Sequence, residues 1–232
     1  ASNNTAVGKD ALTANTTGDS NVAVGNNALD ANTTGTGLVA LGMGSLGSNT
    51  TASSNTAAGY NSLANNTTGA YNSAFGNQAL EANSTANNNT ACGYKALEAN
   101  TTGTANVAVG SEAGDAITTA SNNVAIGYES LTNTTTGSSN TAVGKGALSS
   151  NSTGDGNVAM GHNSLVFNST ADNNTGLGYA ALFTNTTGSE NTAVGKEALY
   201  TNNGSNNSAF GVTSMYANTT GDDNTSVGQS SL

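Results

Sequence analysis

Very few side chains of this sequence could carry out acid–base or nucleophilic chemistry. His162 is the only histidine and Cys92 the only cysteine, and no partner for a general base or a nucleophile recurs near either. We therefore expect His162 to be an exposed turn residue and Cys92 to be a buried, inert thiol. Since no group of residues has the arrangement of a catalytic site, the sequence predicts a protein that is not an enzyme and needs no cofactor.

Acidic side chains could bind cations, because carboxylate oxygens are the ligands that Ca²⁺ prefers. Asp19, Asp155, Asp172 and Asp222 occupy one equivalent position of the repeat described below. They are scattered along the chain, and no closely spaced ladder of carboxylates results. We therefore predict no dedicated metal site.

Ten Asn-Thr/Ser-Thr tripeptides could accept sugars. One interpretation is that these asparagines are needed for a turn and a hydrogen-bonded ladder, and that the glycosylation signals are coincidental. The other is dense glycosylation, either N-linked or on the neighbouring hydroxyl groups. The candidate N-linked acceptors are Asn15, Asn32, Asn49, Asn66, Asn83, Asn100, Asn151, Asn168, Asn185 and Asn218.

All these residues belong to a repeat of seventeen residues that recurs fourteen times. Each copy opens on a phrase such as Asn4-Thr5-Ala6-Val7-Gly8, and only the interval before Gly211 is sixteen residues. Repeats this short cannot bury a core alone, so the sequence predicts one linear array over residues 1–232. With positions counted from Asn4, the copies begin at Asn4, Asn21, Leu38, Asn55, Asn72, Asn89, Asn106, Asn123, Asn140, Asn157, Asn174, Asn191, Asn207 and Asn224.

The charged residues divide each repeat into exposed and buried positions. Every Asp, Glu and Lys falls at position six, seven, ten, sixteen or seventeen. Because unpaired charges are almost never fully buried, the remaining positions are predicted to face inward or to form uncharged turns. Two inward segments follow from this division, one around Val7 at position four and one around Leu12 at position nine.

The pattern predicts an all-β protein, a β-solenoid of about fourteen coils. Glycine, threonine and asparagine are too frequent for helices, and no apolar stripe has the helical period. We expect two short strands and two turns per coil, with parallel coils stacked ~4.8 Å apart. Stacking would align Asn4 with Asn21, and Asn15 with Asn32, in two side-chain amide ladders. Glycine at position five predicts a positive φ or a corner without room for a Cβ atom.

If Val7 points inward, strand alternation turns Ala6 outward. The core of each coil is thin, and an outward column of alanines would form a flat strip suited to packing against another chain. The predicted lateral assembly strip is Ala6, Ala23, Ala40, Ala57, Ala74, Ala91, Ala108, Ala125, Ala142, Ala159, Ala193 and Ala209.

Composition excludes several classes of partner. The net charge is −10 and only four residues are basic, whereas nucleic acids and anionic membranes attract basic surfaces. No apolar run approaches the length of a membrane-spanning helix. The sequence therefore predicts neither nucleic-acid binding nor membrane insertion.

The phrase Asn123-Val124-Ala125-Ile126-Gly127, repeated in tandem, resembles the head domain of trimeric autotransporter adhesins of the Yersinia type. Similar repeats occur in phage tail fibres. The resemblance covers every copy of the repeat. It implies a left-handed parallel β-roll, three chains packed side by side, and an adhesive role at a cell surface.

We therefore expect an extracellular or cell-surface fibrous protein that is structural or adhesive. The first and last copies keep the consensus, which suggests that the chain continues end to end into a longer filament. We also expect copies of the chain to pack side by side, as a trimer. The expected ligand is a host surface or a glycan. The alternatives are a phage tail-fibre shaft and an ice-binding solenoid that uses threonine columns such as those of Thr16 and Thr17. Tyr60, Tyr94 and Tyr128 could form an adhesive row, although a rim of amphipathic residues is the favoured interpretation.

Overall fold

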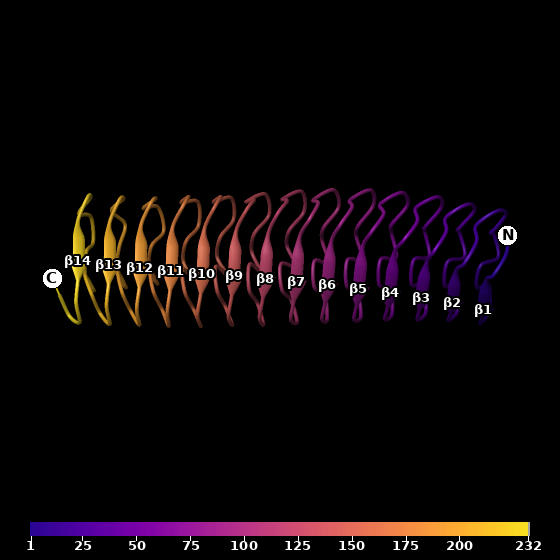
Figure 1. Cartoon of the computed structure of the whole chain (residues 1–232), viewed down its shortest axis with the longest axis horizontal. Coiled ribbons are helices and arrows are strands. Elements are labelled where there is room, and N and C mark those ends of the chain that lie inside the picture. Colours follow the sequence, from indigo (N-terminus) through magenta and orange to yellow (C-terminus); the bar gives the residue numbers. More distant parts are fainter. Residues whose placement is uncertain (232) are drawn as a thin grey trace. The chain divides into compact units, whose positions relative to one another are not determined.

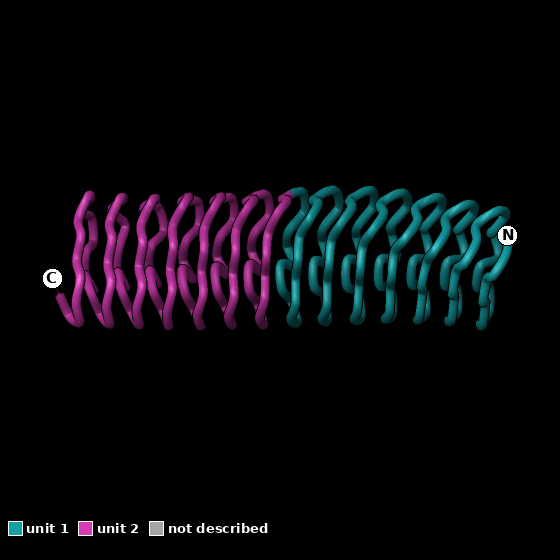
Figure 2. The backbone as a smooth tube through the Cα atoms, in the orientation of Figure 1, with its two compact units in different colours: residues 1–119 teal, residues 120–232 magenta. Residues whose placement is uncertain are grey.

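In the computed structural model, which describes residues 1–231, the chain is an all-β solenoid with coils of about seventeen residues (Figure 1). It divides into two compact units, residues 1–119 (unit 1) and 120–232 (unit 2), each of which is a stack of coils (Figure 2). No helix occurs among the described residues. The predicted fold class is confirmed, whereas its left-handedness stays a prediction. Leu232, which the repeat places at position nine, lies outside the described residues.

Each coil contributes one strand of three residues, formed by positions two to four, and all paired strands are parallel. The register pairs identical repeat positions, for example Ala6 with Ala23 and Val7 with Val24, because each coil returns the chain to the same place after one period. Coil n contains strand βn. In unit 1 the strands are β1 (Thr5–Val7), β2 (Val22–Val24), β3 (Val39–Leu41), β4 (Thr56–Ala58), β5 (Ser73–Phe75), β6 (Thr90–Cys92) and β7 (Val107–Val109). In unit 2 they are β8 (Val124–Ile126), β9 (Thr141–Val143), β10 (Val158–Met160), β11 (Thr175–Leu177), β12 (Thr192–Val194), β13 (Ser208–Phe210) and β14 (Thr225–Val227).

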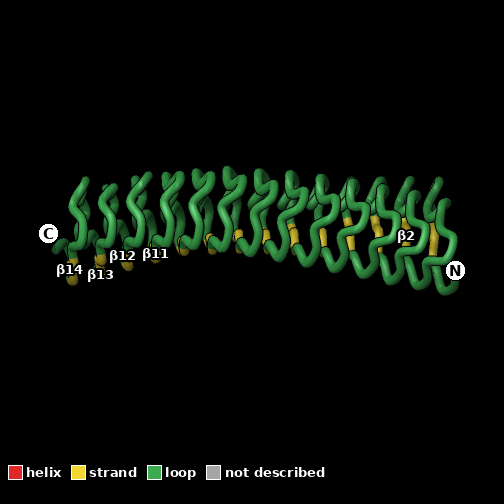
Figure 3. The backbone as a smooth tube through the Cα atoms, turned by 90° about the horizontal axis from the view of Figure 1, so that it is seen from above, coloured by secondary structure: helices red, strands yellow, loops and turns green. Residues whose placement is uncertain are grey.

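The expected second strand in each coil is wrong for the described residues, where turns and loops form the rest of the coil (Figure 3). The leucines of position nine have a left-handed backbone, with φ of 55° at Leu12 and 51° at Leu63. Such a φ interrupts an extended segment and costs a non-glycine residue ~1–2 kcal/mol. Full burial of a leucine side chain contributes ~1.5–3 kcal/mol, which offsets that cost. The turns still bond to the next coil, as Leu12 N–H donates to the Ala28 carbonyl at 3.1 Å.

The predicted orientation of the strand side chains is also wrong. Position three lies in the core: Ala23, Ala40 and Ala74 are completely buried, whereas Val7 at position four is 58% exposed. The interior beside the leucine column has room for little more than a methyl group. A Cβ atom added at Gly176, the position-three residue of coil 11, would lie 2.6 Å from the Ser164 Oγ atom. Larger apolar side chains must therefore occupy the outward position of the strand.

Two ladders of asparagine amides confirm the predicted stacking. At position one, the Asn55 Oδ1 atom accepts from the Asn72 backbone N–H at 2.8 Å. The Asn72 amide group in turn donates to the Ala86 carbonyl at 2.8 Å. At position twelve, the Asn66 amide group donates to the Asn49 Oδ1 atom at 3.1 Å. The side chains thus satisfy buried backbone groups that would each cost ~1–3 kcal/mol if left unpaired.

Position-five glycines take the expected backbone conformation, with φ from 127° at Gly228 to 148° at Gly59. They also allow the coils to approach closely. A Cβ atom at Gly76 would lie 2.7 Å from the Gly93 carbonyl carbon and closer still to its oxygen. Both effects explain why all fourteen copies have glycine here.

Coil 7 departs from the repeat through two linked replacements. Position nine is Gly114 instead of leucine, and position twelve is Ile117 instead of asparagine. A Cβ atom at Gly114 would lie 3.0 Å from the Ile117 Cδ1 atom, so isoleucine fills the space that leucine leaves. The exchange interrupts the amide ladder, and the buried Asn100 Oδ1 atom has no hydrogen-bond partner among the described residues.

Coil 12 departs from the repeat by lacking the residue of position fourteen. Asn203 compensates, because its Oδ1 atom accepts from both the backbone N–H and the hydroxyl of Thr186, at 2.9 and 2.7 Å. The Asn203 backbone N–H donates to the Thr219 carbonyl at 3.0 Å. A coil can therefore close without any residue at position fourteen.

Candidate interaction surfaces

Position four gives each unit an exposed apolar column, which we call the apolar strip. Seven of its members in the interior coils are 38–45% exposed, as at Leu41, Phe75 and Met160, whereas Leu177, Val143, Val194 and Ala58 are half-buried. None of its positions is charged in any copy. The strip consists of Val7, Val24, Leu41, Ala58, Phe75, Cys92 and Val109 in unit 1, and of Ile126, Val143, Met160, Leu177, Val194, Phe210 and Val227 in unit 2.

The strip replaces the predicted alanine strip. Of the twelve alanines assigned to that strip, only Ala6 in the first coil is exposed, and the other eleven are buried. Side chains buried in their own coil cannot contact another chain. The sequence analysis identified the correct strand, but it assigned position three to the outward face and position four to the core, which is the reverse of the structure.

Cys92 lies in the apolar strip and is an exposed free thiol, so the expectation of a buried cysteine is wrong. The cause is the reversed strand orientation, since Cys92 occupies position four. His162 is exposed at position six, as expected, and its ring stacks on Tyr179 with a centroid distance of 5.5 Å.

A ladder of aromatic rings in unit 2 was missed by the sequence analysis. Phe183, Tyr200 and Tyr216 occupy position ten of consecutive coils and stack almost parallel, with centroid distances of 4.9 and 5.0 Å. The pKa of the Tyr200 hydroxyl is raised, mainly because the group is partly removed from water and secondly because of electrostatic repulsion from Tyr216. Because the rings face one another, they present their edges to solvent. The signal in the sequence was three aromatic residues at one repeat position in succession.

The tyrosines of position six lie apart from this ladder. Tyr60, Tyr94 and Tyr128 are each about 45% exposed, and their role as a rim or an adhesive row stays a prediction. Lysine side chains lie over two of these rings: the Lys95 Nζ atom is 5.7 Å from the Tyr94 centroid. A hydrogen bond to Glu98, in an ion pair of 3.1 Å, raises the pKa of Lys95.

The candidate N-linked acceptors are held in the position-twelve ladder. Asn32, Asn49, Asn66, Asn83, Asn100, Asn151, Asn168 and Asn185 are completely buried, and Asn15 and Asn218 are half-buried. Their amide nitrogens donate hydrogen bonds, as from Asn15 to the Gly18 carbonyl at 3.0 Å and from Asn218 to the Gly221 carbonyl at 2.8 Å. The ladder that the turn-and-ladder interpretation requires is therefore present. N-linked glycosylation of these asparagines stays a prediction, and it would replace hydrogen bonds of the ladder.

The two hydroxyl residues that follow each of these asparagines differ in their surroundings. At position thirteen the hydroxyl donates to a carbonyl of the next coil, as from Thr16 to Thr33 at 2.8 Å and from Thr67 to Ser84 at 3.0 Å. At position fourteen every threonine is exposed. The glycosylation alternative that used neighbouring hydroxyl groups therefore remains open at position fourteen.

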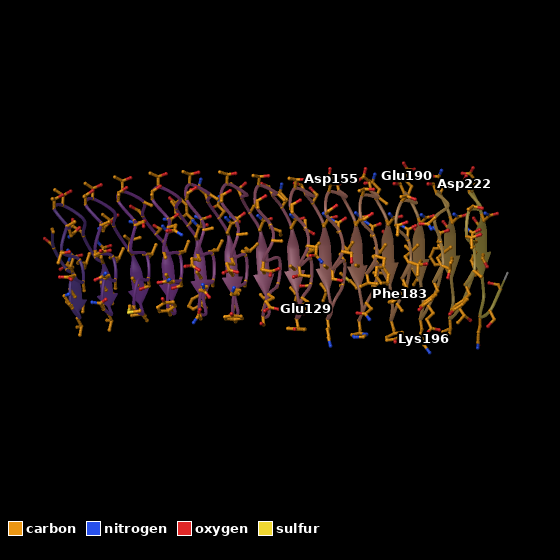
Figure 4. All side chains as sticks on the ribbon, turned by 180° about the vertical axis from the view of Figure 1, so that it is seen from behind. Glu129, Asp155, Phe183, Glu190, Lys196 and Asp222 are labelled. Carbon is orange, nitrogen blue, oxygen red and sulfur yellow. The ribbon has the colours of Figure 1, made fainter. Side chains whose placement is uncertain are left out.

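Charged side chains line the edges of the coils. In unit 2, Asp155, Glu190 and Asp222 lie along one edge of the stack, and Lys196 lies on the opposite edge (Figure 4). The carboxylates of position sixteen accept from backbone N–H groups of the preceding coil, as Asp155 does from Ser138 at 2.6 Å. No charged residue is buried among residues 1–231, which confirms the exposed half of the charge partition. The other half is wrong at position four, which carries no charge and nevertheless faces outward. In the same residues, no group of three His, Cys, Asp or Glu side chains could hold a metal ion.

Comparisons with known proteins give no relative for this chain. No family model, no curated protein and no solved structure matches it. Within residues 1–231, no helix is long and apolar enough to cross a membrane. The surfaces described above are therefore the basis of the functional argument.

Proposed function

We propose that this protein is the shaft of an extracellular structural or adhesive fibre, in which copies of the chain pack side by side through the apolar strip. The observation that carries the proposal is the unbroken apolar character of position four, although this position faces outward. Contiguous exposed apolar surface of this kind marks an interaction site. The extracellular location, the adhesive role and the trimer are expectations from the resemblance to adhesin heads, and a phage tail-fibre shaft would have the same construction.

The strip becomes a stronger interface as coils are added. Covering the exposed ~40% of one Val, Leu or Phe side chain contributes about 0.6–1.2 kcal/mol, from a full value of ~1.5–3 kcal/mol. The loss of translational and rotational freedom on association costs ~4–15 kcal/mol, but it is incurred only once. Seven coils on each of two chains contribute about 8–17 kcal/mol, which is comparable with this cost, whereas one or two coils would contribute far less.

The partner that best fits the strip is a second copy of the same chain. Its strands have the same ~4.8 Å axial spacing, so two parallel copies stay in register over any number of coils. Neighbouring residues of the strip differ in size, as at Ala58, Phe75 and Cys92. A partner with another axial spacing would lose register after a few coils, and such a partner could not use the whole strip.

Charge reversal of the strip is the direct test. We expect the unaltered chain to have a mass in solution of three times 22.6 kDa by light scattering. The variant Phe75→Lys/Ile126→Lys should reduce it to 22.6 kDa, because lysines would be buried against apolar side chains. The control variant Tyr60→Lys/Tyr128→Lys alters side chains of similar exposure at position six and should leave the mass unchanged. A monomeric unaltered chain would overturn the lateral assembly.

Cys92 provides a chemical test of the register. Parallel copies in register place their Cys92 residues at the same coil, and a disulfide requires Cα atoms ~4.4–6.8 Å apart. We expect mild oxidation to link two copies, giving a band of twice 22.6 kDa on a non-reducing gel. Cys92→Ser should abolish it. Moving the thiol to position six, as Cys92→Ser/Tyr94→Cys, should give no such band; equal cross-linking of both variants would contradict the registered strip.

End-to-end continuation into a longer filament belongs to the same proposal. Electron microscopy of native material should show filaments of uniform width. Compact particles without a preferred axis would argue against a shaft, even if lateral trimers formed in solution.

A further inference from the structure

We propose that the exposed threonines of position fourteen are O-linked glycosylation sites. They form one column in each unit, which we call the outer Thr column. Its members are Thr17, Thr34, Thr51, Thr68, Thr85, Thr102 and Thr119 in unit 1, and Thr136, Thr153, Thr170, Thr187 and Thr220 in unit 2. The proposal is independent of lateral assembly, which uses position four.

Position fourteen is threonine in each of the twelve described coils that have this residue. Every member of the column is exposed. Other exposed positions have diverged freely between copies: position six, for example, includes Lys9, Met43 and His162. The surface of the repeats therefore varies from copy to copy, whereas position fourteen holds one residue type throughout.

The fold itself does not require these hydroxyl groups. None of them makes a hydrogen bond within residues 1–231, whereas the hydroxyl of position thirteen bonds the next coil in the same tripeptide, as from Thr33 to Thr50 at 3.0 Å. Coil 12 closes without any residue at position fourteen, through Asn203. The constraint on the outer Thr column therefore comes from outside the coil.

Backbone propensity does not explain the strict choice of threonine. Position fourteen lies in a bend of the coil, where β-propensity does not select threonine. Position two lies in a strand, where β-propensity does act, and it holds Thr5, Val22 and Ser73 in different coils. At position fourteen neither valine, which lacks the hydroxyl, nor serine, which lacks the methyl group, occurs. The hydroxyl is the reactive group, and the β-branched methyl restricts χ1, so that an attached group would project in one direction from every coil.

A sugar fits this column better than a phosphate. Successive coils lie ~4.8 Å apart, and dianionic phosphates at that distance would repel one another by several kcal/mol even in water. The chain already has a net charge of −10. An uncharged sugar adds no such repulsion. In the transfer, the Thr Oγ1 atom attacks the anomeric carbon of a nucleotide-activated sugar, the nucleoside diphosphate leaves with its bonding electrons, and the hydroxyl proton passes to a base of the transferase.

Site mapping on protein isolated from its native source tests the proposal. Peptides are sequenced by mass spectrometry after electron-transfer fragmentation, which keeps O-linked sugars in place. We expect hexose-type mass additions on the threonines of the outer Thr column, and none on the residues of positions twelve and thirteen. An unmodified native chain, phosphate in place of sugar, or sugars only at other positions would overturn the proposal.

A variant in the native host separates modification from folding. Thr34→Val/Thr51→Val/Thr68→Val should lose the added mass in coils 2, 3 and 4 while its thermal unfolding midpoint stays within about 2 °C, because no hydrogen bond is lost. The control Thr33→Ser/Thr50→Ser/Thr67→Ser keeps the hydroxyls of position thirteen and should retain the added mass. If the native chain is unmodified and shows thermal hysteresis that the valine variant abolishes, the column contacts ice and the glycosylation proposal is wrong.

Discussion

Alanine at Gly76 is expected to destabilise the solenoid by at least ~3 kcal/mol, because two separate costs combine. The backbone φ of 133° is one that residues with a side chain rarely adopt. In addition, the new Cβ atom would lie 2.7 Å from the Gly93 carbonyl carbon, so coils 5 and 6 would have to separate. Separation would break the hydrogen bond from Gly93 N–H to the Phe75 carbonyl, 2.8 Å long. Urea unfolding followed by circular dichroism measures the loss.

The matched control is Gly37→Asn, at position seventeen of coil 2. Gly37 has a φ of 65°, which asparagine tolerates, and no atom lies within 4 Å of a Cβ atom placed there. Asparagine occupies the same position at Asn88 and Asn173. We expect a change of less than ~0.5 kcal/mol. If the two substitutions lowered stability equally, the close approach of the coils could not be the reason that position five excludes side chains.

Transplanting the exchange of coil 7 into coil 4 should give two destabilising single variants and a much milder double variant. Asn66→Ile removes the amide bonds to Asn49 and to the Gly69 carbonyl, at 3.1 and 2.9 Å, and crowds the Leu63 side chain. We expect a loss of ~3–5 kcal/mol. Leu63→Gly leaves a cavity at a cost of ~2–5 kcal/mol, reduced slightly because glycine relaxes the left-handed backbone.

In the double variant Leu63→Gly/Asn66→Ile, isoleucine fills the cavity as Ile117 does beside Gly114. The two losses should therefore combine to at least ~1.5 kcal/mol less than their sum. The control double variant Leu63→Gly/Asn66→Ala removes the same amide without filling the cavity, so it should show no such gain. Purely additive losses in the first pair would mean that Ile117 does not replace the missing leucine side chain. Chemical unfolding of six proteins completes the comparison: the unaltered chain, the two double variants, and the single variants Leu63→Gly, Asn66→Ile and Asn66→Ala.

The sequence predicted the solenoid because stacking forces like residues into columns. Charges at five positions marked the outside, and columns of Asn66 and Asn72 marked the ladders, since a buried amide needs a partner in the adjoining coil. These inferences depend on burial and hydrogen bonding, and the regular period gives equivalent positions the same surroundings in every coil. The described residues confirm the solenoid, the exposure of the charged positions and the two ladders.

The orientation of the strand could not be deduced from alternation alone, which allows two opposite solutions. The decisive signal was the size of the residues: position three is almost always alanine, whereas position four ranges from Ala58 to Phe75. A narrow interior restricts the size of the side chains that point into it, whereas an outward-facing position accepts side chains of any size. The same error placed Cys92 inside and assigned assembly to the buried alanines.

The missing second strand and the aromatic ladder had other causes. Leucine is not expected in a left-handed backbone, and only its burial in the core, as at Leu63, compensates for that conformation. The ladder of Phe183, Tyr200 and Tyr216 arises because three consecutive coils have an aromatic residue at position ten. A consensus of all copies does not show this, because most copies have other residues at that position. Comparing each coil with its immediate neighbours would have revealed it.

The constant separation of about seventeen residues between hydrogen-bonded partners also determines how such a chain can fold. Partners such as Asn49 and Asn66 stay equally close in sequence however many coils are present, so relative contact order falls as the array lengthens. Closing each new coil costs the same loop entropy as the last, and the finished edge offers a template for the next. Growth can therefore proceed coil by coil from one end, at the rate at which the chain becomes available, without waiting for distant segments to meet.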